Sequence, residues 1–142
     1  MKKHLIALRG RSNVGKSSTL HLLYKCLLTH PGTKPIRFRA LGRKLDFLAI
    51  VSIEGFTVGI FNRGDIPATV QELLDELVGE KCQVIVCAAR TKGDIEDVLT
   101  SQGRKYKLAQ MQKKASAGKS QSISNNATAH SLAAMVYAAI DA

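Results

Sequence analysis

Two glycines, a lysine and a serine lie close together near the start of the chain, in a spacing that suits phosphate chemistry. Four residues separate Gly10 from Gly15, and Lys16 and Ser17 follow directly. Glycine lets a backbone curl so that consecutive N–H groups point at phosphate oxygens, and lysine adds a positive charge. A serine hydroxyl can bind Mg²⁺, which neutralises charge on neighbouring phosphates. The segment therefore predicts a site for a phosphate-bearing ligand.

This chemistry needs a strand before the glycine segment and a helix after it, because a helix N-terminus attracts anions. His4 to Arg9 is a short apolar run that predicts a buried strand ending at Gly10. Residues 18–29 carry apolar side chains at helical spacing, and Pro31 and Gly32 end the pattern. The expected order is strand, glycine loop, helix.

The segment from Gly10 to Ser17 matches the pattern GxxxxGK[ST] and resembles the P-loop, or Walker A motif, of P-loop nucleoside triphosphatases. The resemblance implies a nucleoside triphosphate ligand, ATP in preference to GTP, together with Mg²⁺. Lys16 is then expected to reach the β- and γ-phosphates, and Ser17 to bind Mg²⁺. The ligand-binding residues implied by the motif are Gly10, Arg11, Ser12, Asn13, Val14, Gly15, Lys16, Ser17 and Ser18.

The rest of the chain is consistent with a single α/β domain over residues 1–142. The resemblance implies that this domain has a three-layer P-loop fold with a mostly parallel sheet. The residues 47–53 and 56–61 read as two strands of an antiparallel hairpin. Residues 101–127 have few large apolar side chains and predict a mobile basic loop, with a basic helix near 105–114 as an alternative. The other expected elements are a half-exposed strand at 36–41, a helix from Asp65 to Gly79, a strand at 83–88 and a final helix at 127–142.

An acidic residue at the end of a neighbouring strand holds Mg²⁺ in that family, and Asp65 is the candidate that the resemblance favours here. Asp65 follows the strand at 56–61, but Asn62, Arg63 and Gly64 intervene, so the usual apolar run into the aspartate is not met. A helix N-cap is the alternative role for Asp65. Asp46 and Glu54 rank below it because they lie at the start of a strand or in a turn, and Asp94 is a further candidate near the site.

The reaction stays open between hydrolysis and phosphoryl transfer. The glycine segment also looks like that of small bacterial ribosome-assembly GTPases, and Thr91 to Asp94 has the TKxD form of a guanine-reading motif. No aspartate is followed by glycine at the third position, so the DxxG segment of those GTPases is missing. A GTP-binding protein is therefore the alternative to an ATP-binding one.

A small kinase would need an arginine beside the transferred phosphoryl group and a lid that excludes water. Arg90 follows the strand at 83–88 and is the catalytic candidate, alongside Lys16 and Asp65. The alternative is that the basic run from Arg104 to Lys119 is a solvated, mobile loop and that Arg90 is a surface or capping residue. The candidate lid residues are Arg104, Lys105, Lys107, Lys113, Lys114 and Lys119.

Charge is strongly segregated along the chain, whose formal net charge is +10. The acidic residues fall almost entirely between Asp46 and Asp97, and both ends are basic. The surplus charge at Arg37, Arg39, Arg43 and Lys44 predicts an acidic second substrate or a nucleic acid partner. A nucleotide-dependent module that binds nucleic acid or protein is thus a second class, although the absence of tryptophan argues against base stacking.

The remaining expectations concern compartment and assembly. Cys26, Cys82 and Cys87 form no CxxC pair, which favours reduced thiols and a cytoplasmic protein. No apolar run approaches the length of a membrane span, so no membrane association is expected. A chain this small with a short sheet can also pair as a homodimer.

Overall fold

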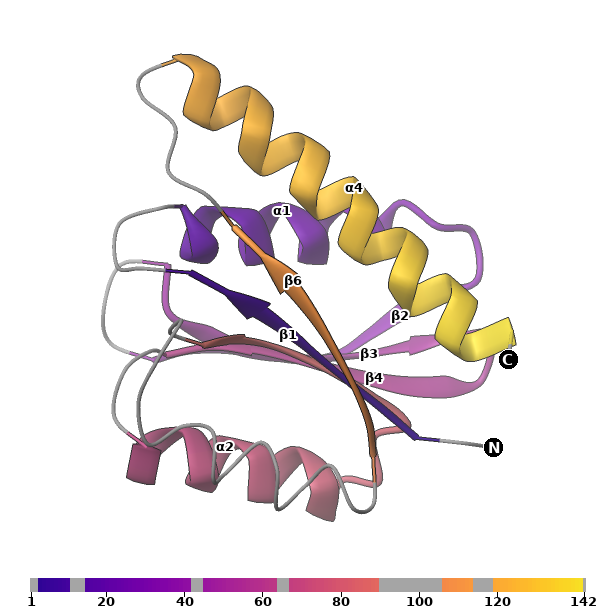
Figure 1. Cartoon of the computed structure of the whole chain (residues 1–142). Coiled ribbons are helices and arrows are strands. Elements are labelled where there is room, and N and C mark those ends of the chain that lie inside the picture. The colour runs from indigo at the N-terminus through magenta and orange to yellow at the C-terminus, as the bar shows by residue number, and fades with distance from the viewer. Residues whose placement is uncertain are drawn as a thin grey trace.

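The computed structural model describes residues 3–10, 15–41, 45–63, 67–89, 106–113 and 119–141. These residues form an α/β structure in which three helices cover a mixed sheet of six strands (Figure 1). The elements in chain order are β1 His4–Arg9, α1 Lys16–Leu28, β2 Thr33–Ala40, β3 Phe47–Ile53, β4 Phe56–Asn62, α2 Pro67–Gly79, β5 Val84–Ala89, β6 Lys107–Gln112 and α4 Lys119–Asp141.

The strand order in the sheet is β2-β3-β4-β5-β1-β6. The pairs β4–β5, β5–β1 and β1–β6 are parallel, whereas β2–β3 and β3–β4 are antiparallel. The predicted hairpin is confirmed: Phe47 pairs with Asn62 and Ile53 with Phe56 around a turn at Glu54 and Gly55. The strands β1, β4, β5 and β6 all end at one edge of the sheet, which we call the carboxyl edge.

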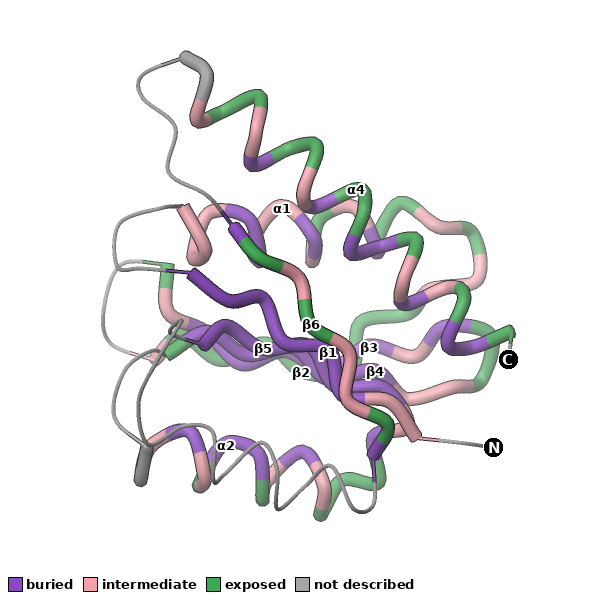
Figure 2. The backbone as a smooth tube through the Cα atoms, viewed as in Figure 1, coloured by how far each residue is buried: buried purple, intermediate pink, exposed green. Residues whose placement is uncertain are grey.

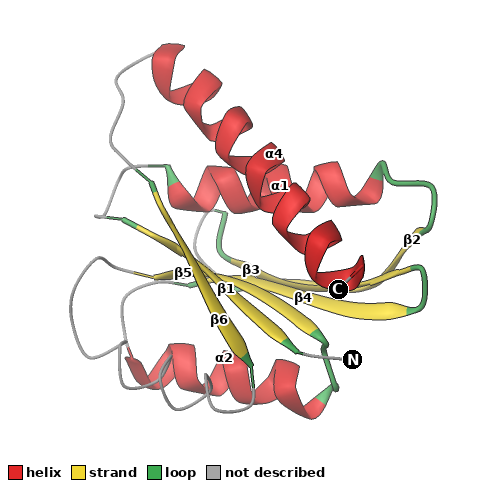
Figure 3. Ribbon diagram, turned by 45° about the vertical axis from the view of Figure 1, so that its right-hand side comes forward, coloured by secondary structure: helices red, strands yellow, loops and turns green. Residues whose placement is uncertain are grey.

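The helices divide between the two faces of the sheet. α1 and α4 lie together on one face and α2 lies on the other, as the two ribbon views agree (Figures 1 and 3). Alternate residues of β1 point into the two cores: Ile6 and Leu8 pack on the α1 and α4 side, and Leu5 and Ala7 on the α2 side. The central strands are therefore buried almost throughout (Figure 2).

The chain leaves the carboxyl edge in opposite directions after two of these strands. β1 leads to α1 on one face, and β4 leads to α2 on the other, with β5 between them. In open α/β sheets, ligands bind outside the carboxyl ends of the strands at such a change of direction. The fold thus places the segment after β1 where a ligand site is expected.

The segment 101–127 differs from the predicted mobile loop. Residues Lys107–Gln112 form β6, which pairs in parallel with β1, and α4 begins at Lys119. The prediction of a loop is wrong for these residues, and so is the alternative of a basic helix at 105–114. The sequence pattern does not predict β6, because β6 is an edge strand whose side chains are half-exposed or exposed. Its alternation of apolar and polar residues is therefore weak.

α4 is the longest helix and covers the same face as α1. Its buried residues include Ala129, Leu132, Val136 and Ile140, at the three- and four-residue intervals of a helix face that packs on a core. The alanines let α4 approach α1 closely, and the two helices are in direct contact. Within the described ranges, no helix combines the length and apolarity that crossing a membrane requires.

Candidate functional site

The glycine segment joins β1 to α1 at the carboxyl edge. β1 ends at Arg9, and the N–H of Gly10 donates a 3.1 Å hydrogen bond to the carbonyl of Ala89 at the end of β5. Gly15 is the N-cap of α1 with φ of 93°, a left-handed conformation that favours glycine. The predicted strand before the glycine segment and the predicted helix after it are confirmed, whereas residues 11–14 between them lie outside the described part of the chain.

Lys16, the first residue of α1, points back across the ends of two strands. Its ammonium group donates hydrogen bonds of 2.6 Å to the carbonyl of Gly10 and 3.1 Å to the carbonyl of Ala89. The positive charge therefore lies at the carboxyl edge, between β1 and β5. An anion in front of this edge would meet both this charge and the N-terminus of α1.

The first turn of α1 is tied to Gly15 and leaves its serines half-buried. The carbonyl of Gly15 accepts hydrogen bonds from the backbone N–H of Thr19, at 2.9 Å, and from its hydroxyl, at 2.7 Å. Ser17 and Ser18 precede this anchor and are partly accessible. Among the described residues, no side chain caps the N-terminus of α1, and the positive end of the helix dipole lies here.

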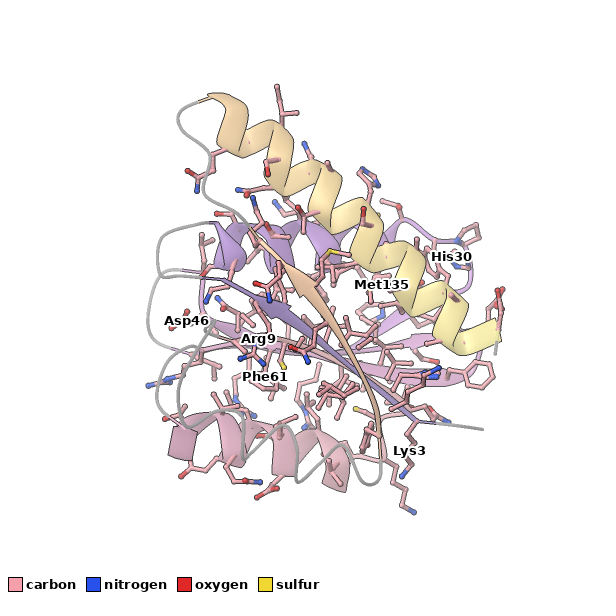
Figure 4. The ribbon with its side chains drawn as sticks, in the orientation of Figure 1. Lys3, Arg9, His30, Asp46, Phe61 and Met135 are labelled. Atoms are coloured by element: carbon pink, nitrogen blue, oxygen red, sulfur yellow. The ribbon has the colours of Figure 1, made fainter. Side chains whose placement is uncertain are left out.

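The carboxylate of Asp46 lies at the end of β4, in contact with the last residue of that strand. Figure 4 shows Asp46 and Arg9 toward the same edge of the sheet. Asn62, the buried last residue of β4, donates from its amide to the Asp46 carboxylate and to the Leu45 carbonyl, each at 3.3 Å. The sequence alone ranks Asp46 below Asp65, because Asp46 comes at the start of a strand. Since β3 is antiparallel to β4, however, the start of β3 lies at the carboxyl edge.

Asp65, the favoured Mg²⁺ ligand, lies outside the described residues, as do Arg90 and Asp94. The same holds for three of the lid candidates, Arg104, Lys105 and Lys114, for the rest of the guanine-type segment at 91–93, and for Arg43 and Lys44. Their predicted roles stay predictions. Lys119 is the first residue of α4. Lys107 is exposed and starts β6, where it pairs with His4; it therefore lies at the opposite end of the strands from Lys16.

Lys113 is a buried residue and not part of an exposed basic surface. It follows β6, is 4% exposed, and donates a 2.7 Å hydrogen bond from its ammonium group to the hydroxyl of Ser124 on α4. Its backbone N–H is bonded to the carbonyl of Arg9, which fixes it at the carboxyl edge beside β1. Burial lowers the pKa of Lys113. A second cation thus lies at this edge, where the sequence predicted only a basic lid.

Two of the arginines assigned to the surplus charge are paired within the chain. Arg39 forms two hydrogen bonds with the carboxylate of Glu76 on α2, at 2.7 and 2.8 Å, and Arg37 is 3.1 Å from Glu80. The bond from Arg39 is the main cause that lowers the pKa of Glu76. These contacts hold the edge strand β2 against α2, so Arg37 and Arg39 offer less free charge to an acidic partner than the sequence suggested.

The described residues contain no cluster of three or more histidine, cysteine or acidic side chains that could hold a metal by themselves. Mg²⁺ bound with a nucleotide needs only one or two protein oxygens, since phosphates and water complete its shell. Ser17 and Asp46 are described residues that carry such an oxygen. No family model, curated protein or solved structure matches the chain.

Proposed function

We propose that this protein binds a nucleoside triphosphate at residues 10–18, with Mg²⁺, and hydrolyses it or transfers its terminal phosphoryl group to an unidentified acceptor. The observation that carries the proposal is the position of Lys16, whose ammonium group lies over the ends of β1 and β5 beside the N-terminus of α1. ATP is the proposed nucleotide, and the fold is proposed to be the three-layer P-loop fold.

The proposed roles follow from the charge of the ligand. The backbone N–H groups at the start of α1 would hold phosphate oxygens, and Lys16 would leave its carbonyl partners to bind the terminal phosphates. An anion attracts the ammonium group of Lys16 more strongly than a neutral carbonyl does, because both partners of the hydrogen bond then carry charge. Ser17 would contact Mg²⁺, which neutralises the charge that develops on the transferred group.

The carboxylate that completes this site is proposed to be Asp65 or Asp46. Asp46 belongs to the carboxyl edge and is held there by the amide of Asn62. A carboxylate in this position would orient Mg²⁺ or the attacking water against the terminal phosphate. Arg90 is proposed as the cation that stabilises the transferred phosphoryl group.

The test is a thermal-shift panel of ATP, GTP, ADP and GDP, each with and without Mg²⁺. A ligand that binds only the folded state raises its stability by RT ln(1 + [L]/Kd), so no substrate needs to be known. We expect ATP with Mg²⁺ to give the largest rise in Tm, and Lys16→Ala to abolish it. Lys34→Ala, which removes an exposed cation from β2, is the matched control and should respond like the wild type. Equal shifts in wild type and Lys16→Ala would contradict the proposal.

A further inference from the structure

Lys113 lies beside the start of the glycine segment, on the side of β1 that faces away from β5. Its backbone N–H donates a 2.6 Å hydrogen bond to the carbonyl of Arg9, so Lys113 comes level with Gly10 in the sheet. β5 and β6 are the two neighbours of β1. The glycine segment therefore has Lys113 on its β6 side and, on its β5 side, the ammonium group of Lys16 bonded to Ala89.

The side chain of Lys113 lies on the face of the sheet that α1 and α4 cover. Ala109 and Met111, which alternate along β6 toward Lys113, pack on the core of that face. The ammonium group of Lys113 donates a 2.7 Å hydrogen bond to the hydroxyl of Ser124 on α4. Because α1 packs on the same face (Figure 1), this cation and the helix N-terminus of the proposed phosphate site share one side of the sheet.

Ser124, the partner of Lys113, is next in the chain to a residue that contacts the N-cap of α1. Asn125 packs so closely on Gly15 that a Cβ atom on Gly15 would lie 2.4 Å from Asn125 Oδ1. Asn125 is 6% exposed, and this oxygen has no hydrogen-bond partner among the described residues. Two buried polar side chains, those of Asn125 and Lys113, thus approach the N-terminus of α1 from α4 and β6.

The surroundings of Lys113 disfavour its positive charge. Lys113 is 4% exposed, and burial lowers its pKa. An ammonium group that has left water raises the free energy of the folded state, because the protein interior solvates charge poorly. An anion that binds nearby reverses this balance, since opposite charges attract more strongly where water is excluded. The position therefore favours a cation that acts on a ligand over one that only stabilises the fold.

We infer that Lys113 is a second phosphate-binding lysine, which leaves Ser124 for the triphosphate when the nucleotide binds; this rests on the proposed function. A triphosphate carries more negative charge than Mg²⁺ and the ammonium group of Lys16 offset. A lysine ammonium group is a point charge on a flexible four-carbon stem, so it can turn toward an anion without a change in the backbone. A charged acceptor would then replace the neutral hydroxyl of Ser124.

The experiment measures the Kd of ATP and of inorganic triphosphate for the wild type and Lys113→Met by titration calorimetry with Mg²⁺. We expect the variant to bind both ligands about tenfold more weakly, because the lost contact is with phosphate. The Tm of the unliganded variant should equal that of the wild type or exceed it, since a buried charge is removed. Lys113→Gln keeps a donor for Ser124 without the charge. It carries the same expectation for both affinities and decides the matter if Lys113→Met does not fold.

Two further variants separate phosphate binding from a structural role. Lys34→Met removes the same charge from β2, at the other edge of the sheet, and should change neither affinity. If Lys113 binds the phosphates, Ser124→Ala should bind ATP at least as tightly as the wild type, because the competing hydroxyl is gone. If Lys113 only ties β6 to α4, Lys113→Met and Ser124→Ala should both lower the Tm and leave the affinities unchanged.

The inference is overturned by unchanged affinities in folded Lys113→Met and Lys113→Gln. A loss for ATP without a loss for inorganic triphosphate would also overturn it, because the contact would then be with the nucleoside. If the wild type binds neither ligand, the proposed function fails as well. If binding depends on Lys16 but not on Lys113, the proposed function stands and only the role of Lys113 is lost.

Discussion

The ammonium group of Lys16 donates a 2.6 Å hydrogen bond to the carbonyl oxygen of Gly10, six residues earlier in the chain. Together with its bond to Ala89, this contact ties the first residue of α1 to the ends of β1 and β5. The lysine is therefore already held at the carboxyl edge, and a bound anion would only have to replace carbonyl partners.

Lys16→Met tests how much these bonds stabilise the unliganded protein. Each neutral carbonyl would lose a charged donor, and we expect the free energy of unfolding to fall by about 1–2 kcal/mol. Urea denaturation followed by circular dichroism measures it. If the variant unfolds at the same urea concentration as the wild type, the two hydrogen bonds of Lys16 contribute nothing to the free energy of unfolding, because water replaces them equally well.

Gly15→Ala is expected to destabilise the fold by about 1–3 kcal/mol. The φ of 93° disfavours any side chain, and the new Cβ would lie 2.4 Å from Asn125 Oδ1. Gly79→Ala is the matched control, since no atom lies within 4 Å of its added Cβ among the described residues. Thermal denaturation compares the two, and equal Tm values would contradict the packing of Asn125 on Gly15.

The pair Arg39–Glu76 predicts a pH-dependent share of stability. The pKa of Glu76 lies below its usual value of 4.5 in the folded protein, chiefly because Arg39 donates to it. The pair therefore contributes its full stabilisation at pH values above the pKa of Glu76 in the unfolded chain. This stabilisation is lost as the pH falls through the lower pKa of Glu76 in the folded protein. We expect Arg39→Ala to cost about 0.5 kcal/mol at pH 7, since the pair is partly exposed, and less below pH 4.5.

Denaturant titrations at pH 7 and at pH 3.5 measure that difference. Lys34→Ala, on the same strand, serves as the control. A cost that stays constant or grows on acidification would mean that Arg39 acts through its packing on β2 and not through Glu76.

The thiols should differ in reactivity. Burial raises the pKa of both Cys82 and Cys87 to about 12, whereas Cys26 is half-buried, with its sulfur 3.8 Å from His130 Nδ1. Alkylation by iodoacetamide at pH 8 should modify one cysteine in the folded protein and three in urea, because the thiolate is the reactive form. Mass spectrometry identifies the residues, and rapid labelling of Cys87 in the folded protein would contradict its burial in the sheet.

The two candidate carboxylates can be separated by Asp46→Asn and Asp65→Asn. The residue that binds Mg²⁺ should, when replaced, weaken ATP binding with Mg²⁺ by about tenfold and leave metal-free binding unchanged. A helix cap or a partner of Asn62 would instead lower the Tm and affect both measurements alike. If neither variant separates the two conditions, no Mg²⁺ ligand lies at either position.

Local patterns in the sequence predicted most of the elements but only part of the site. The hairpin from β3 to β4 was readable because Glu54 and Gly55 form a turn between two apolar runs. β6 was missed because an edge strand buries little, and α4 begins eight residues before the predicted start because its first turns are polar.

Two site residues, Asn62 and Asn125, were not predicted, and Lys113 was predicted for a basic lid and not for a buried position; all three differences share one cause. Each belongs to the site through a contact distant in sequence: Asn62 with Asp46, Lys113 with Arg9 and Asn125 with Gly15. No local pattern marks such an approach. A buried polar residue can be recognised as functional only once the fold shows what it faces.

The central claim is tested most directly by titration calorimetry of ATP with Mg²⁺ into the wild type and Lys16→Ala. The account predicts one site per chain in the wild type and an affinity at least about thirtyfold weaker in the variant, since a partly buried charge partner of the phosphates is removed. Circular dichroism would show that the variant keeps its fold. Absence of binding to the wild type, or an equal Kd for a folded Lys16→Ala, would contradict the account.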